Sequence, residues 1–265
     1  MLRVLEADQN GAIEALYVEA RLARTFDDGS TSFANWTGRD VIPVLERNHA
    51  SADALSPLAQ AIGDVDSAYD QAIGRNYAGM ARRLIVDSGL YSISPSPWHH
   101  LLVQPWTSHG LTRQLAFIAR MIPAERAPWP QRIDQLIALG NPLWAVPKNM
   151  TEHEYVENSV WYATSNIASF RCVRVAIAAE QYKRERGELP SSQDVLVPKY
   201  LPAGVVDPFS GRSLLLKKNE GGYIVYSVGV NRTDDGGAIS DGPNVIFADR
   251  KRQSAADVGV RIRYR

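Results

Sequence analysis

The chain has 265 residues, of which 45% are hydrophobic and 22% are charged, which is the composition of an ordinary globular protein. Its 29 Lys and Arg residues balance its 29 Asp and Glu residues, so no global field favours a nucleic acid or an anionic membrane as partner. The single cysteine, Cys172, excludes an internal disulfide and a cysteine-rich metal site. No run of about 18 apolar residues occurs, which argues against a membrane-spanning helix within this sequence.

The first part of the chain carries helical periodicity and no strand-like alternation. Apolar residues recur at three- and four-residue steps, and turn-forming residues separate the periodic segments. Asp40 is expected to cap the second helix, and Ser56–Pro57 is expected to start the third. The four helices predicted from this pattern cover residues 10–26, 40–48, 56–69 and about 68–87.

Residues 92–110 and 123–149 combine proline with tryptophan. Proline interrupts helices, and tryptophan favours burial with its N–H paired, so we interpret these stretches as irregular connections anchored to a helical body. Short helices are expected at 111–121 and 131–139. The alternative is a recognition loop lined by aromatic and histidine side chains. Its candidate residues are Trp98, His99, His100, Trp106 and His109.

The same loop carries the enzymatic alternative. If it folds back on itself, the histidines of residues 98–109 could form a metal or acid–base cluster. Solvent-facing or hydrogen-bonded histidines are the simpler interpretation. The sequence contains no serine nucleophile elbow, phosphate-cradling glycine loop or dinucleotide fingerprint. We therefore predict no catalytic residue and no organic cofactor.

A long helix is expected to begin after Thr151, whose capping box is completed by Glu154, and to continue to Arg186. Its two apolar stripes together form a face wider than a single sheet needs. We expect this helix to be a spine shared by the early helices and a C-terminal sheet. The stripes contain Trp161, Ser165, Ala168, Cys172, Val175, Ala179 and Tyr182, and Phe170, Val173 and Ile177.

Two groups on this helix have simple structural interpretations. Cys172 lies within an apolar stripe, so it is expected to be a packing residue and not a nucleophile. Near the C-terminal end, a solvated, ion-paired surface is expected from Glu180, Lys183, Glu185 and Arg186.

Beyond Pro190 the apolar period changes from helix-like to strand-like. After a short helical turn through Val197, strands are expected at 214–216, 223–226 and 245–247, with a turn at 217–222 between the first two. The sheet is thus expected within residues 205–247, followed by a basic tail at 248–265. Alternation of Val258, Val260 and Ile262 leaves a further short strand in that tail open.

The order of these C-terminal signals resembles the globular part of a type II secretion major pseudopilin. It resembles more closely a group of uncharacterised bacterial proteins in which such a module follows a helical region. The resemblance covers about residues 167–247, and the order and spacing of its turn and cap signals carry it. The matching segments are Ala179–Pro190, Leu196–Pro202, Asp207–Gly211, Gly222–Gly229 and Asp234–Gly237.

The resemblance implies a calcium site in the loop after Ser227, because the corresponding pseudopilin loop binds calcium through backbone carbonyls and acidic side chains. Asp234, Asp235 and Asp241 could supply such oxygens here. Asn231 and Asn244 stand where the family pattern has acids. An amide oxygen can still coordinate calcium, but the lost charge predicts weak binding.

These observations predict an α+β protein, with an all-α region at 1–150 and a pseudopilin-like module at 151–265. The helix of the module lacks the very hydrophobic segment through which pseudopilins polymerise. We expect a non-enzymatic, extracytoplasmic module that binds a protein or another component of the cell envelope. Its location would be periplasmic, or membrane-anchored through a segment upstream of this sequence. The alternatives are an enzyme with its site in residues 98–109 and a purely architectural domain of an envelope assembly.

Overall fold

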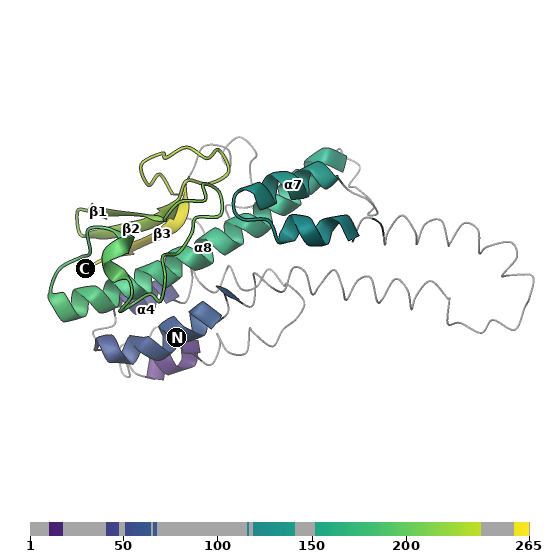
Figure 1. Cartoon of the computed structure of the whole chain (residues 1–265). Helices are drawn as coiled ribbons and strands as arrows, with labels where there is room; N and C mark the ends of the chain where they lie inside the picture. The colour runs from purple at the N-terminus through teal and green to yellow at the C-terminus, as the bar shows by residue number, and fades with distance from the viewer. Residues whose placement is uncertain are drawn as a thin grey trace, which may run out of the picture. The chain divides into compact units, whose positions relative to one another are not determined.

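The computed structural model describes residues 11–17, 41–47, 51–64, 66–67, 116, 119–140, 152–239 and 257–264. Over these ranges the chain is α+β, as predicted (Figure 1). None of the described helices is long and apolar enough to cross a membrane. The elements are α4 (Ile42–Arg47), α7 (Gln131–Leu139), α8 (Glu152–Arg186), η2 (Gln193–Leu196), β1 (Leu215–Asn219), β2 (Gly222–Ser227) and β3 (Val258–Arg263), and further helical segments lie at 11–17, 52–64 and 119–125.

The chain divides into two compact units. Unit 1 comprises Met1–Asp70 and Trp161–Arg265, and unit 2 comprises Gln71–Val160. The spine helix α8 contributes residues to both. The two units are groups of residues that pack together. They do not test the expected division at residue 150 into an all-α region and a pseudopilin-like module, which stays a prediction.

The long helix predicted from Thr151 to Arg186 is confirmed as α8, a continuous helix of 35 residues. It ends where Gly187 adopts a positive φ of 77° and donates its N–H to the Lys183 carbonyl at 2.7 Å. A side chain is strained in that backbone conformation, which explains the glycine. The predicted cap, Thr151, lies outside the described residues.

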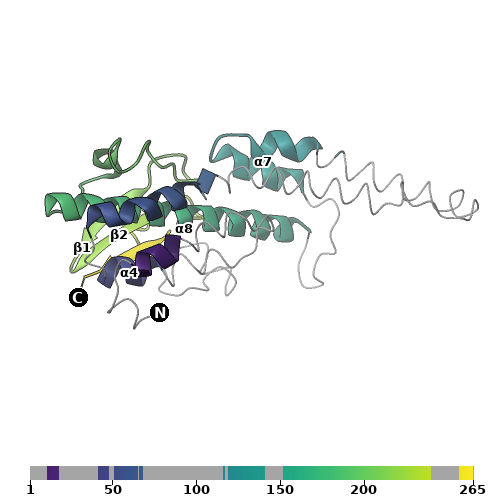
Figure 2. The same cartoon turned by 90° about the horizontal axis from the view of Figure 1, so that it is seen from below.

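In unit 1 the spine helix is covered on more than one flank. Residues 175–179 of α8 are fully buried, which no single packed layer can achieve for five successive helical positions. The early helices and the sheet supply the cover, and Figures 1 and 2 show helix 52–64 along one flank of α8 and the strands along another. One hydrophobic core joins them, including Leu16, Val44, Leu45, Leu55, Leu58, Ile62, Cys172, Ile177, Tyr223, Val225 and Ile262.

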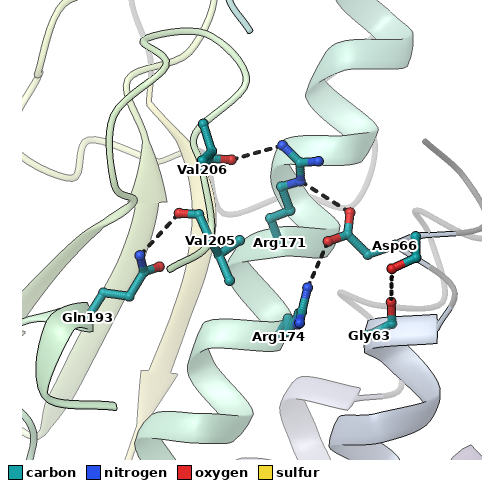
Figure 3. Close-up of polar contacts among 8 residues, drawn as sticks. Gly63, Asp66, Arg171, Arg174, Gln193, Val205 and Val206 are labelled. Atoms are coloured by element: carbon teal, nitrogen blue, oxygen red, sulfur yellow. Dashed lines mark hydrogen bonds and ion pairs between the residues drawn. The ribbon is translucent and has the colours of Figure 1, made fainter. Parts of the chain in front are cut away.

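Buried polar contacts fix the packing of the early helices on α8 (Figure 3). Asp66 accepts hydrogen bonds from Arg171 Nε and Arg174 Nη1, each at 3.1 Å. Arg171 Nη1 also donates to the Val206 carbonyl at 2.9 Å, and Gln193 Nε2 donates to Val205 at the same corner. The Asp66 carboxylate thus ties the end of the early helices to α8, and Arg171 connects this contact to the segment that leads into the sheet.

The third early helix begins earlier than predicted, at residue 52 and not at Ser56. Ser51 provides its cap, because the Ala54 N–H donates to Ser51 Oγ at 3.3 Å. Ser56 has a different role, since its hydroxyl accepts a hydrogen bond from Gln181 Nε2 of α8 at 3.0 Å. The Ser-Pro pair was therefore misread as a start signal.

Two other predicted helices are present, one of them with shifted bounds. The helix expected at 111–121 is described from 119 and continues to Glu125, so Pro123 lies inside its last turn and does not end it. The helix expected at 131–139 is confirmed as α7. Helical residues at 11–17 and in α4 agree with the first two predicted helices. Asp40 and the segment 68–87 lie outside the described residues.

The described sheet is antiparallel and has the order β1-β2-β3. In the hairpin, Asn219 pairs with Gly222, so the turn is the two residues Glu220–Gly221 and not the predicted segment 217–222. Gly221 has a φ of 75°, as this tight turn requires. The two lysines of the predicted turn instead extend β1, with their side chains exposed.

The third strand comes from the predicted basic tail. Residues Val258–Arg263 form β3, which pairs with β2 from Gly222↔Arg263 to Ser227↔Val258. Within the described residues the sheet therefore extends beyond the predicted limit at 247, and the open alternative of a strand in the tail is confirmed. Val260 and Ile262 are buried, as their alternation indicated. The strand expected at 245–247 lies outside the described residues.

Candidate functional site

The loop that follows β2, residues 228–239, contains the predicted calcium ligands that the structure describes. Its base is fixed by Asp207, which is 1% exposed. Asp207 accepts hydrogen bonds from Ser227 Oγ at 2.6 Å and Ser210 Oγ at 2.8 Å, and from the N–H groups of Phe209 and Val228. This aspartate begins the Asp-Pro-Phe-Ser-Gly turn, so one carboxylate organises both the turn before β1 and the exit from β2.

Asp234 is held by the loop and by the strand before it. Its Oδ1 accepts hydrogen bonds from Tyr226 Oη at 3.0 Å and from the Gly236 N–H at 2.8 Å. Burial, reinforced by the bond and charge of Asp234, raises the pKa of Tyr226 to about 12. Lys217 Nζ of β1 donates to the Gly236 carbonyl at 2.8 Å. The loop is therefore fastened across the outer face of the sheet.

Asn231 and Asp235 face each other across the same turn. Asn231 Nδ2 donates to Asp235 Oδ2 at 2.9 Å, and Asn231 Oδ1 accepts the Thr233 N–H at 3.0 Å. The amide thus bridges the ends of a turn in which Arg232 takes a positive φ of 57°. An acid in place of Asn231 would repel Asp235, so the asparagine suits this arrangement without a bound cation.

Asp257 is a further acid of this site that the sequence analysis missed. It is 3% exposed, and it accepts the Gly237 N–H at 2.7 Å and the Asp235 N–H at 3.3 Å. Burial raises its pKa, and the charges of Asp235 and Asp234 add to that effect. It reaches the loop through a parallel bridge to Ile239. No sequence signal links residues this far apart, because the contact depends on β3 joining the sheet.

The structure thus brings Asn231, Asp234 and Asp235 into one turn and adds Asp257 beneath it. Within the described part of the chain, no group of three or more His, Cys, Asp and Glu residues is placed to hold a metal ion. Several of the oxygens already accept hydrogen bonds from the loop itself. Asp241 and Asn244, the other predicted ligands, lie outside the described residues, so the calcium site stays a prediction.

The predicted recognition loop is also outside the described residues. This applies to each of its members, Trp98, His99, His100, Trp106 and His109. Their convergence, on which the enzymatic alternative depends, stays a prediction. Cys172, in contrast, is fully buried on α8 with its thiol 3.6 Å from the Val258 carbonyl, and burial raises its pKa. This agrees with its predicted packing role.

Glu180 was expected on a solvated surface, but it is 3% exposed. Its Oε1 accepts the Tyr264 hydroxyl at 2.6 Å, and its Oε2 lies 3.7 Å from Arg184 Nη2. Burial and the Glu180 contact raise the pKa of Tyr264. Tyr264 directly follows β3, so the prediction failed for the same reason that Asp257 was missed.

A second unusual acid lies in unit 2. Glu125 is 7% exposed, and neither of its carboxylate oxygens has a hydrogen-bond partner among the residues described. Burial raises its pKa to about 7, although the positive charge of Arg132 acts in the opposite direction. Glu125 belongs to no motif, and no signal in the sequence distinguishes it from the other glutamates.

Comparisons with known proteins give no relative from which to transfer a role: no protein-family model, no curated protein and no solved structure matches this chain.

Proposed function

We propose that this protein is a non-enzymatic, extracytoplasmic module of pseudopilin-like design that binds a protein partner of the cell envelope and does not polymerise. The observation that carries the proposal is the enclosure of α8. Residues 175–179 are fully buried between the chain's own early helices and its own sheet. A helix enclosed in this way has no free face along this stretch with which to build a filament.

The polar contacts support a permanent enclosure. Asp66 pairs with two arginines of α8, and Gln181 Nε2 of α8 donates to the Ala52 carbonyl at 3.2 Å and to Ser56. At the edge of the sheet, the Arg263 N–H donates to Glu46 Oε1 of α4 at 3.0 Å. Separation of the early helices would break the buried contacts of Asp66 and Gln181 with α8 and the early helices, which is costly.

The acidic loop supports the binding part of the proposal. Residues 232–236 are exposed, yet the turn is held by Asn231, Asp234 and Asp257 through side-chain hydrogen bonds. An exposed loop that is already ordered loses little conformational entropy when a partner binds. In this proposal, calcium binds weakly to the loop with Asp241 and Asn244 as additional ligands, and the loop contacts the partner.

The non-polymerising role is tested by sedimentation velocity of the purified chain over a hundredfold concentration range, with 5 mM calcium or with chelator. We expect the same small species throughout. Concentration-dependent filaments would contradict the proposal.

Extracytoplasmic location is tested by fusing the full gene product to a reporter enzyme that is active only outside the cytoplasm. Reporter activity is expected, and an inactive fusion in the cytosolic fraction would contradict that part.

The contact surface is tested by photo-crosslinking in intact cells. A photoreactive residue at Ala238, an exposed position of the loop, is compared with one at Val195, which is 43% exposed on η2. We expect a discrete envelope-associated adduct from position 238 that disappears when Asp234 and Asp235 are both changed to Asn. Equal adducts from both positions would show that the loop has no special role.

A further inference from the structure

Glu125 lies at the point where helix 119–125 turns into α7, in a tightly closed helical hairpin. The turn is made by the Ala127 N–H donating to the Ala124 carbonyl at 3.2 Å and by the Arg132 N–H donating to the Pro128 carbonyl at 3.1 Å. Ala124, Ala127 and Ile133 are buried together with Glu125. The Glu125 side chain is therefore buried at the junction of the two helices.

No described group donates a hydrogen bond to the Glu125 carboxylate. Arg132 is the charged residue of the described chain whose field acts on Glu125. Its guanidinium, however, stacks over the Trp129 ring with its central carbon 4.3 Å from the ring centroid, and its Nε donates to the Ala127 carbonyl at 3.0 Å. The nearby Arg126 and Asp134 are exposed. A buried carboxylate without donors is strongly disfavoured in its ionised form.

We propose that Glu125 is a proton-operated latch of the 119–140 hairpin. The neutral acid is compatible with the closed hairpin, whereas the ionised carboxylate requires water and opens it. The latch is independent of the proposed envelope function. It would keep the hairpin closed in acidic surroundings and loosen it at neutral and alkaline pH.

The direction of the pH dependence follows from the two pKa values. The pKa of Glu125 is about 7 in the closed hairpin, against 4.5 for the free side chain. The closed form is therefore favoured most below about pH 4.5, loses stability as the pH rises towards 7, and changes little above 7. The difference of about 2.5 in pKa corresponds to a shift of up to about 300-fold in the opening equilibrium.

Amide hydrogen exchange of residues 119–140 in the full chain, between pH 5 and 8, tests the latch. After correction for the intrinsic exchange rate, we expect protection to fall by up to about 70-fold in the native protein between these two pH values, because part of the full shift has already occurred at pH 5. Glu125→Gln, a neutral mimic of the protonated acid, should keep the hairpin protected across the range. Asp134→Asn, which removes an exposed carboxylate from α7, should behave as the native protein does.

Protection of the native hairpin that does not change with pH, or a pH dependence that survives in Glu125→Gln, would overturn the proposal. Glu125→Met keeps a similar volume without an ionisable group and gives the same test if the glutamine variant does not fold. Independently, a carbon-13 titration of labelled glutamate carboxyl groups in the native protein should show one midpoint near pH 7. Midpoints that all lie near 4.5 would also overturn it.

Discussion

The two units differ in whether their buried carboxylates accept hydrogen bonds from the described residues. In unit 1, Asp66 accepts hydrogen bonds from two arginines, Asp207 from four donors, and Glu180 from Tyr264. In unit 2, Glu125 accepts none from the described residues. The burial of these side chains is similar, so the difference lies in their partners.

The partnered acids connect segments that are far apart in the sequence. Arg171 and Asp66 are separated by 105 positions, and Tyr264 and Glu180 by 84. Each such contact is satisfied in one arrangement of the chain and costs free energy in others, so it helps to specify the fold. A buried acid without partners has no such role, and its ionisation opposes folding instead.

The largest expected effect comes from Asp66→Ala. The change leaves two largely buried guanidinium groups, those of Arg171 and Arg174, without their carboxylate. We expect the free energy of unfolding to fall by about 3–5 kcal/mol, measured by urea denaturation. Glu188→Ala, which removes an exposed carboxylate beyond α8, is the control and should change it by less than about 0.5 kcal/mol. If Asp66→Ala and Glu188→Ala lower the free energy of unfolding equally, the buried, hydrogen-bonded carboxylate of Asp66 has no special role in stability.

Asp207→Asn should have the next largest effect. The amide can accept at one atom only, so its NH₂ group faces either the Ser227 hydroxyl and the Phe209 N–H or the Ser210 hydroxyl and the Val228 N–H. We expect a loss of about 2–3 kcal/mol in the free energy of unfolding. Asp194→Asn, an exposed change in η2, is the matched control. If both variants melt as the native protein does, Asp207 does not organise the turn.

The elements that the sequence predicted well have local causes. α8 was predicted over its full length because apolar periodicity, Gly187 and Pro190 all act within a few residues of each other. The hairpin was placed correctly, but its turn was overextended because Lys217 and Lys218 resemble turn residues when seen without their partners on β2. The helix start at 52 was missed because Ser51 and Ser56 are equivalent as sequence signals, and the contact with Gln181 distinguishes them.

The candidate site was only partly predictable, because some of its contacts join residues that are far apart in the sequence. Asn231, Asp234 and Asp235 share one turn, so their proximity follows from the sequence. Asp257 joins them only because β3 pairs with β2, and Glu180 is buried because Tyr264 follows the same strand. Glu125 is distinguished by having no hydrogen-bond partner among the described residues, and no sequence pattern predicts this.

Gly259→Ala tests the strand that completes the site, with a smaller expected effect. A methyl group at this position would collide with the Val225 carbonyl and lie 2.7 Å from Tyr226 Cβ. Backbone atoms cannot move aside cheaply, so we expect a loss of about 1–3 kcal/mol, together with weaker amide protection in β2. Gly204→Ala meets only the Gln193 side chain, at 3.5 Å, and serves as control. Unchanged stability would contradict the pairing of β2 with β3.

The acidic loop is intermediate between the hydrogen-bonded acids of unit 1 and Glu125 of unit 2. Asp234, Asp235 and Asp257 accept some hydrogen bonds from the loop, but their negative charges lie close to one another. A weak calcium site, with a dissociation constant on the order of 1 mM, would raise the free energy of unfolding by about 1.4 kcal/mol at 10 mM calcium. Thermal melts with calcium and with chelator measure this difference. Magnesium at the same concentration should have less effect, because it requires a tighter octahedral geometry. Asp234→Asn combined with Asp235→Asn should abolish the calcium effect. If calcium does not change the melting temperature of the native protein, the calcium site is contradicted. The repulsion among these acids would then be balanced by the loop's own hydrogen bonds.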